Sequence, residues 1–149
     1  MRLTIATNVQ SQPEKVWAKF DADLFVRLAP PFPPVRLVHF GGCQTGDRVE
    51  IELKFLLFRL RWLSVITEHS IGDDEIFFVD EGRVLPFFLR QWRHCHRLIR
   101  TDEGTRIVDQ IEYHSRFLWL DYLLFPMMWG QFAYRRPIYR RVFNTSHAE

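Results

Sequence analysis

The sequence predicts an α+β fold in which a curved antiparallel sheet of about seven strands wraps around one long C-terminal helix, with two short helices near the N-terminus. Three observations predict this fold: one strand pattern precedes two helix patterns, six further strand patterns follow one another, and a long apolar segment ends the chain. Consecutive strands at hairpin spacing favour an antiparallel meander over parallel crossovers. We expect residues 1–149 to form a single domain.

The first elements are predicted from strand alternation and helix-start signals. The segment RLTIATNV alternates between two faces, as a half-buried strand does. The next segment, SQPEKVWAKF, predicts a helix with Ser11 as its N-cap and Pro13 in its first turn. A second short helix, DADLFVRL, ends at APPFPPV, whose prolines force an extended connection.

The rest of the chain alternates strands with short turns before it ends in a helix. The predicted strands are VRLVHFGG, DRVEIELKFLLF, RLRWLSVITEH, EIFFVDEG, RQWRHCHRLIR and GTRIVDQIEYH. One long helix is predicted from Leu120 to Phe143, in which Pro126 and Pro137 are expected to cause kinks or breaks. A sheet of this length closed by one apolar helix naturally leaves a cavity between the two.

The apolar segment FLWLDYLLFPMMWGQFAY is barely as long as the bilayer core requires. Because it contains Asp121, Pro126 and Gly130, we expect a helix packed against the sheet and no integral membrane span. Its Trp119, Met127, Met128 and Trp129, together with Trp62, are expected to fill the core or to line the cavity.

Charge and cysteine content narrow the class of protein. The net charge is only +2, which gives no support for nucleic-acid binding. Arginines cluster only in YRRPIYRR, which indicates either a solvated helix end or a surface for anionic lipid or a partner. Cys43 and Cys95 form no CxxC motif, and no signal-peptide pattern opens the sequence, so we expect free thiols and a cytoplasmic location.

The most informative stretch is QWRHCHRL, whose alternation places Trp92, His94, His96 and Leu98 on one face. Burying the opposite face would bury two arginines and a glutamine, so the histidine face should point inward. If Asp102 and Glu103 form a two-residue hairpin loop, His96 lies across from Asp109, at hydrogen-bond distance. A bulge at Gly104 would shift this register by one residue.

Three interpretations of His94, His96 and Asp109 remain open: a satisfied polar cluster in the cavity wall, ligand recognition by an imidazole, and acid–base chemistry by the Asp109–His96 pair. A metal triad of two histidines and a carboxylate is a further pattern, but no other residue supports it. We therefore expect no metal and no cofactor. The sequence contains no phosphate-binding loop, dinucleotide fingerprint or nucleophile elbow.

The element order and four motifs resemble the helix-grip proteins called SRPBCC or START-like, which include Bet v 1 relatives, polyketide cyclase/dehydrase-like proteins and lipid-transfer domains. The motifs are F-x-D at Phe78 and Asp80, W-x-H-x-H at Trp92 to His96, G-T-x-x-x-D-x-x-x-Y at Gly104 to Tyr113, and F-x-Y-R at Phe132 to Arg135. The resemblance is greatest to a bacterial ligand-binding branch. It implies the fold and a hydrophobic cavity, but it does not imply one reaction.

Two segments depart from the pattern of this branch. The stretch between Pro86 and Trp92 is longer than in that branch, and Leu85 and Pro86 stand where the branch has a Gly-Pro pair, so the start of the next strand is expected to be bulged. SRFLWLD replaces the Pro-Gly segment that the branch has after Tyr113.

The expected function is binding of a small hydrophobic ligand, such as a lipid, a polyketide-like compound or an aromatic compound, between sheet and helix. The expected ligand contacts are Trp62, Trp92, His94, His96, Asp109, Tyr113 and Met127. One alternative is a cyclase or dehydratase in which His96 and Asp109 are the catalytic candidates. Another is a membrane-peripheral or protein-interaction module that uses the arginines at positions 135, 136, 140 and 141.

Overall fold

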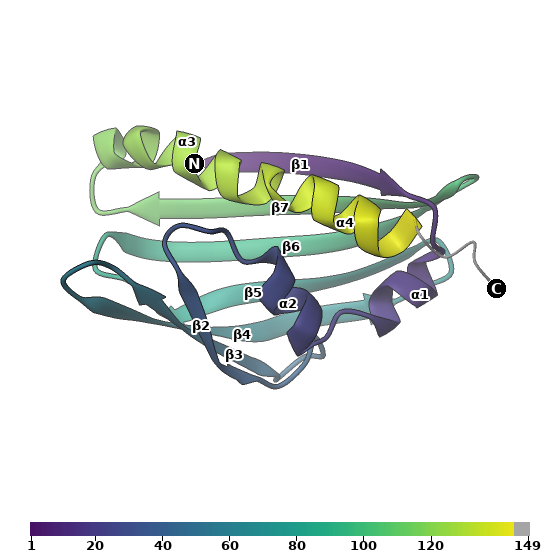
Figure 1. The fold of residues 1–149 in the computed structure, drawn as a ribbon, viewed down its shortest axis with the longest axis horizontal. Helices are drawn as coiled ribbons and strands as arrows, with labels where there is room; N and C mark the ends of the chain where they lie inside the picture. The colour runs from purple at the N-terminus through teal and green to yellow at the C-terminus, as the bar shows by residue number, and fades with distance from the viewer. Residues whose placement is uncertain (145–149) are drawn as a thin grey trace.

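The computed structural model describes residues 1–144 and contains a seven-stranded antiparallel sheet, as predicted (Figure 1). The strands lie in the order β1-β7-β6-β5-β4-β3-β2, so six strands form a meander and β1 pairs with the edge of β7. Their bounds are β1 (Arg2–Val9), β2 (Val35–Phe40), β3 (Arg48–Lys54), β4 (Arg59–Ile71), β5 (Glu75–Val84), β6 (Leu89–Thr101) and β7 (Gly104–Ser115).

Two short helices follow β1, namely α1 (Pro13–Ala18) and α2 (Ala22–Leu28). The prediction that Ser11 caps the first helix is wrong, because the N-cap residue is Gln12 and its side chain makes no capping hydrogen bond. The Ser11 hydroxyl instead donates to the carbonyl oxygen of Phe143, at 2.7 Å. A long-range hydrogen bond that ties the first helix to the last one has replaced the local cap. Asp21 caps α2 by accepting from the backbone N–H of Leu24.

The predicted C-terminal helix is two helices, α3 (Leu118–Ala133) and α4 (Arg135–Asn144), which run one after the other past β1 and β7 (Figure 1). Pro137 explains the break, because a proline cannot donate to the carbonyl of the residue four positions earlier, here Ala133. Pro126 lies inside α3, and the helix continues through it. None of the helices within residues 1–144 combines the length and the apolar character needed to cross a bilayer.

The expectation that α3 packs its apolar residues against the sheet is only partly met. Three of its side chains are buried, those of Asp121, Met128 and Phe132. Five large apolar or aromatic side chains of α3 are at least half exposed: Leu118, Trp119, Tyr122, Leu123 and Trp129. Trp119 and Trp129 therefore belong to neither the core nor the cavity wall, in contrast to the prediction.

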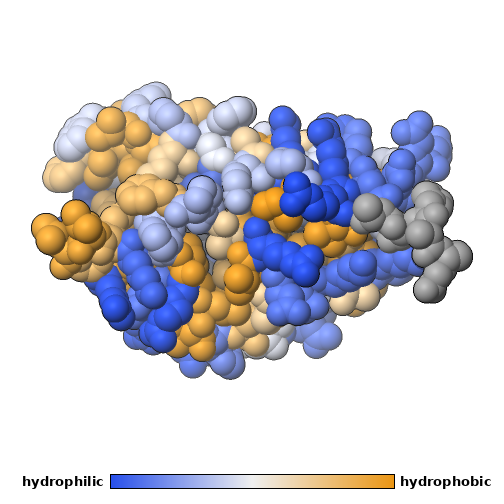
Figure 2. All heavy atoms as spheres, in the orientation of Figure 1, coloured by the Kyte–Doolittle hydropathy of each residue, from blue (hydrophilic) through white to orange (hydrophobic). Residues whose placement is uncertain are grey.

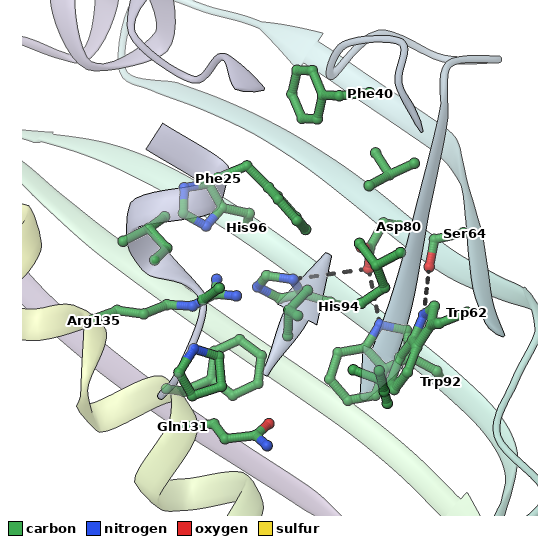
Figure 3. Close-up of a pocket in the computed structure, with 18 of the residues that line it drawn as sticks. Phe25, Phe40, Trp62, Ser64, Asp80, Trp92, His94, His96, Gln131 and Arg135 are labelled. Atoms are coloured by element: carbon green, nitrogen blue, oxygen red, sulfur yellow. Dashed lines mark hydrogen bonds and ion pairs between the residues drawn. The ribbon is translucent and has the colours of Figure 1, made fainter. Parts of the chain in front are cut away.

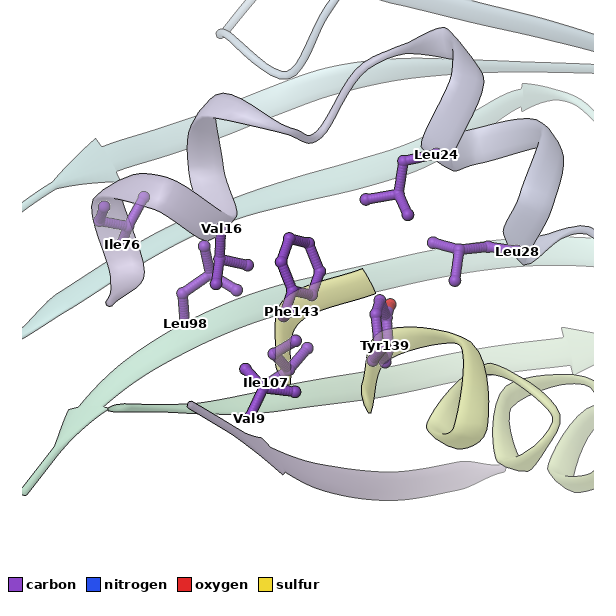
Figure 4. Close-up of a cluster of buried hydrophobic side chains, with 9 residues drawn as sticks. All are labelled: Val9, Val16, Leu24, Leu28, Ile76, Leu98, Ile107, Tyr139 and Phe143. Atoms are coloured by element: carbon purple, nitrogen blue, oxygen red, sulfur yellow. The ribbon is translucent and has the colours of Figure 1, made fainter. Parts of the chain in front are cut away.

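The tightly packed core lies where α1, α2 and α4 meet the sheet (Figure 4). Its members share an exposed fraction below 5% and come from both ends of the chain: Val9, Val16, Leu24, Leu28, Ile76, Leu98, Ile107, Tyr139 and Phe143. Burying this surface supplies the main driving force for folding. It also fixes α4 on the sheet, and α4 carries two residues of the site described next.

Candidate functional site

A cavity of about 310 Å³ lies between the sheet, the α1–α2 region and α3 (Figure 3). Its wall is mostly apolar and aromatic, with Phe25, Phe40, Trp62, Phe78 and Trp92 among the lining side chains. A few polar groups interrupt this surface: Asp21, Ser64, Asp80, His94, His96, Gln131 and Arg135. An apolar cavity with a few polar groups is the usual form of a small-molecule site, and this volume lies near the lower limit of such pockets.

The two histidines reach the cavity because of the alternation of β6. Trp92, His94, His96 and Leu98 are all buried, so the predicted inward face is confirmed. The predicted register is confirmed too, because His96 pairs with Asp109 and His94 with Ile111. No bulge forms at Gly104, whose φ of +143° closes the hairpin. The expected irregularity at the start of β6 is present, between Leu89 and Gln91.

Asp109 joins the two histidines through a single carboxylate oxygen. Its Oδ1 lies 2.7 Å from His94 Nε2 and 2.8 Å from His96 Nδ1, so the predicted Asp109–His96 contact is part of a three-residue cluster. The hydroxyl of Tyr139 donates to Asp109 Oδ2 at 3.4 Å, and Arg135 Nη1 lies 3.8 Å from Oδ1. A buried carboxylate surrounded by four donor side chains is well stabilised as an anion.

The charges of this cluster follow from its surroundings. Burial alone would raise the pKa of Asp109, but the adjacent His96 and the hydrogen bonds from both histidines hold it well below its usual range. Burial lowers the pKa of His96, which therefore remains neutral at pH 7. Because ionised Asp109 only accepts hydrogen bonds, the proton of the neutral His96 ring must sit on Nδ1. His96 Nε2 is then an acceptor, and among residues 1–144 it has no hydrogen-bond partner.

A second carboxylate, Asp80, lies on the other side of His94. Asp80 Oδ1 accepts a hydrogen bond of 3.1 Å from Trp92 Nε1 and lies 3.8 Å from His94 Nδ1. Burial raises the pKa of Asp80, and His94 opposes this rise only in part. Asp80, the acidic residue of the F-x-D motif, thus orients Trp92 and lies beside the histidine cluster.

No family model matches this chain, and no curated protein matches it. Solved structures do match. They include protein Ms6760 from Mycobacterium smegmatis, with 17% identity over 98% of this chain and 92% of that one and a TM-score of 0.67. They also include norcoclaurine synthase from Thalictrum flavum in complex with dopamine and hydroxybenzaldehyde, with 12% identity over 89% and 82% of the chains and a TM-score of 0.63.

The Zhui aromatase/cyclase from a Streptomyces species, R1128, matches over 100% of this chain and 99% of its own, with 12% identity and a TM-score of 0.65. Both chains are thus covered almost from end to end by one common architecture. The chain has a helix-grip fold like that of these structures. At these identities the comparisons establish the fold alone.

The expected ligand contacts occupy two different positions in this helix-grip protein. Trp62, Trp92, His94, His96 and Met127 line the cavity. Asp109 and Tyr113 are not among the lining residues in the described part of the chain. Asp109 lies behind the two histidines, whereas the Tyr113 hydroxyl donates to the carbonyl oxygen of Asp121 at 2.8 Å and anchors the start of α3.

Arg135 was predicted as part of the surface arginine cluster, but the structure places it at the cavity. Its guanidinium lies 4.4 Å from the centre of the Phe132 ring and points toward His94 (Figure 3). Tyr139 was missed altogether, because nothing in the pattern PIYRR distinguishes an inward tyrosine from an ordinary amphipathic position. The F-x-Y-R motif was the one signal that could have separated Arg135 from Arg136 and Arg140, which are exposed.

The cluster also has the residue types of a metal site. The nearest ligand atoms of His94, His96 and Asp109 lie within 4.8 Å of one another. Both imidazole nitrogens in this group already lie at hydrogen-bond distance from the same carboxylate oxygen. The atoms of this group that face one another are therefore paired by hydrogen bonds, and His96 Nε2 is the atom of the group left without a partner within residues 1–144.

Proposed function

We propose that this protein binds a small, largely apolar molecule that carries one hydrogen-bond donor, and that His96 Nε2 accepts this donor. One observation carries the proposal: a buried acceptor that has no hydrogen-bond partner within residues 1–144 belongs to a residue that lines an apolar cavity. An unsatisfied buried polar group costs about 1–3 kcal/mol, and a hydroxyl or N–H of the ligand would remove that cost.

The aromatic wall supports an aromatic or polyketide-like ligand over a long aliphatic chain. Side chains of Phe25, Phe40 and Trp62 face the cavity in Figure 3. Two of the structural neighbours, by name, act on aromatic compounds: a norcoclaurine synthase bound to dopamine and hydroxybenzaldehyde, and an aromatase/cyclase. Flat rings fit a cavity of about 310 Å³ near the lower end of the usual range.

The test changes the ligand and leaves the protein intact. Simple phenols, their methyl ethers and the corresponding hydrocarbons are titrated against the protein, and binding is followed by the fluorescence of Trp62 and Trp92, which line the cavity. If His96 Nε2 accepts the phenol proton, the phenol binds about tenfold more tightly than its ether, since one hydrogen bond contributes about 1–1.5 kcal/mol. Equal affinity for phenol and ether would contradict the assignment of His96, and absence of binding by the whole series would contradict the proposal.

A second candidate function is acid–base catalysis of a cyclisation or dehydration in the same cavity. The observation that favours it is the pairing of Asp109 with His96 Nδ1, because a carboxylate there orients the ring and leaves Nε2 free to take a proton from a substrate. The lowered pKa of His96 makes it a weak base, which favours binding over catalysis. For a ligand found above, loss of turnover in His96→Gln at unchanged affinity would establish the enzyme.

A further inference from the structure

Large apolar side chains are exposed together at one end of the molecule, away from the packed core. Leu56 and Leu57, at the tip of the β3–β4 hairpin, are 98% and 90% exposed. We call the following set the apolar end; its members are all more than 60% exposed: Phe32, Leu56, Leu57, Phe87, Trp119 and Leu123. Figure 2 shows hydrophobic residues gathered at this end.

The sheet topology brings these residues together. The β3–β4 hairpin closes with Lys54 opposite Arg59, which leaves residues 55–58 at its tip. The start of β6 pairs with the end of β7, Leu89 with Ser115, so Phe87 and the start of α3 leave the sheet on the same side. Contacts between aromatic rings join the loops, since the ring centres of Phe58 and Phe87 are 6.4 Å apart and those of Phe32 and Phe55 are also 6.4 Å apart.

The stability of this fold does not require two adjacent exposed leucines at a hairpin tip, because neither side chain is buried in the folded chain. Hairpin turns are usually polar and rich in glycine or asparagine, whereas FLLF has neither. Isolated exposed apolar residues are ordinary, but large apolar side chains exposed on several segments at one end of a protein mark a place of contact with another molecule or a membrane.

The charges around the apolar end indicate what that contact is. Basic residues lie beside three of the four apolar segments: Lys54 and Arg59 around FLLF, Arg83 and Arg90 around VLPFFL, and Arg116 before FLWL. Apart from Arg59, which lies 3.4 Å from Glu52, none of them has an acidic partner within the described residues. The one acidic residue at the start of α3, Asp121, is buried, and its carboxylate accepts from the backbone N–H of Ser115.

We propose that the apolar end is a docking surface for a lipid bilayer with anionic headgroups. Apolar tips with cations at their base match a membrane surface, where leucines enter the acyl boundary and arginines meet phosphate or carboxylate groups. Trp119 and Tyr122, both exposed on the first turns of α3, are the aromatic residues that prefer the headgroup level. This surface is distinct from the arginine cluster of α4. The docking proposal does not depend on the identity of the ligand in the cavity.

The cavity extends to the same end. Three of its lining residues, Phe55, Phe88 and Leu124, are immediate chain neighbours of the exposed Leu56, Phe87 and Leu123. A docked protein would therefore hold one border of its cavity against the bilayer. An apolar ligand could then pass between membrane and cavity with little exposure to water.

The experiment measures sedimentation of the whole chain with vesicles of phosphatidylcholine mixed with phosphatidylserine, and with vesicles of phosphatidylcholine alone. The unmodified protein is expected to bind the mixed vesicles more tightly. The double variant Leu56→Ser/Leu57→Ser should lose more than about tenfold in affinity, since both side chains are exposed in the free protein and would be buried on docking. The control Ile71→Ser, at a 59% exposed position at the opposite end of β4, should bind as the unmodified protein does.

The charge contribution has its own matched pair of variants. Arg83→Gln/Arg90→Gln, at the base of the apolar end, should weaken binding to the mixed vesicles by about fivefold per charge. Arg136→Gln/Arg140→Gln removes the same charge from exposed positions of α4 and should change the affinity little.

Three results would overturn the proposal. One is failure of the unmodified protein to bind the mixed vesicles, and another is equal binding by the leucine variant. The third is a concentration-dependent dimer, seen by analytical ultracentrifugation, that the leucine variant abolishes while vesicle binding is absent. That result would make the apolar end an interface between two copies of the chain.

Discussion

Asp109→Asn changes the charge of the buried cluster while it leaves the shape nearly unchanged. In the unmodified protein, Asp109 Oδ1 accepts two short hydrogen bonds, from His94 Nε2 at 2.7 Å and from His96 Nδ1 at 2.8 Å. A hydrogen bond to a charged group contributes about 1.5–3 kcal/mol, whereas one to a neutral group contributes about 0.5–1.5 kcal/mol. The two bonds together therefore lose about 2–3 kcal/mol.

Two smaller effects oppose each other. The amide no longer has to be desolvated as an anion, which stabilises the variant, but Arg135, whose Nη1 lies 3.8 Å from Oδ1, loses a favourable neighbour. We take the net loss as about 2 kcal/mol. Urea unfolding at neutral pH, followed by tryptophan fluorescence, should show a midpoint about 1 M lower than that of the unmodified protein.

Asp80→Asn is the matched control. Asp80 lies beside the same histidine, but within residues 1–144 its one side-chain hydrogen bond is the longer contact with Trp92 Nε1 at 3.1 Å, and burial raises its pKa. A carboxyl group that is already closer to neutral loses less when it becomes an amide, so we expect a cost below about 1 kcal/mol. If Asp109→Asn costs no more than Asp80→Asn, the description of Asp109 as the anion that holds the cluster together is wrong.

Three further predictions concern other parts of the molecule. Because burial lowers the pKa of His96, the unfolded chain binds a proton that the folded chain does not, so the free energy of unfolding should fall as the pH drops below 6.5; urea titrations at several pH values measure this. Gly104→Ala should lower the free energy of unfolding by more than about 2 kcal/mol, because an added Cβ would lie 2.3 Å from the carbonyl oxygen of Val9. The control Gly46→Ala, at a position with positive φ but no atom within 4 Å of the added Cβ, should lower it by about 1 kcal/mol in the same assay. The Cys43 thiol, whose pKa burial raises to about 12, should resist iodoacetamide at pH 8 in the folded protein and react once it is unfolded; labelling and mass spectrometry follow this.

Strand alternation was sufficient to place the histidines and Asp109, for a simple physical reason. A strand has only two faces, and one face of β6 carries two arginines and a glutamine that are expensive to bury. The two-residue loop at Asp102 and Glu103 then fixed the register of β7 without any further information. Rules based on strand alternation and turn length predict contacts between the two strands of one hairpin, such as His96 with Asp109. They do not predict contacts between residues that are far apart in the sequence.

The errors lie where residues distant in the sequence meet. Ser11 has the right side chain for a helix cap, but the carbonyl oxygen of Phe143, at the other end of the chain, competes for its hydroxyl. Arg135 and Arg136 are neighbours in the same cluster, and their residue type does not distinguish Arg135, which lines the cavity, from Arg136, which is exposed. The apolar length of α3 suggested burial, yet periodicity could not reveal that the sheet would cover only one narrow side of it.

The position of His96 in the fold adds an argument for a site that is formed before any ligand arrives. Its ring lies 4.5 Å from the ring centre of Phe20 and 6.3 Å from that of Tyr139, and Tyr139 belongs to the packed core of Figure 4. Asp109 holds Nδ1 from the other side, so both the plane of the ring and its tautomer are fixed by residues that already stabilise the fold. An acceptor held in this way has little conformational entropy left to lose, and a ligand that donates to it gains nearly the full free energy of the hydrogen bond.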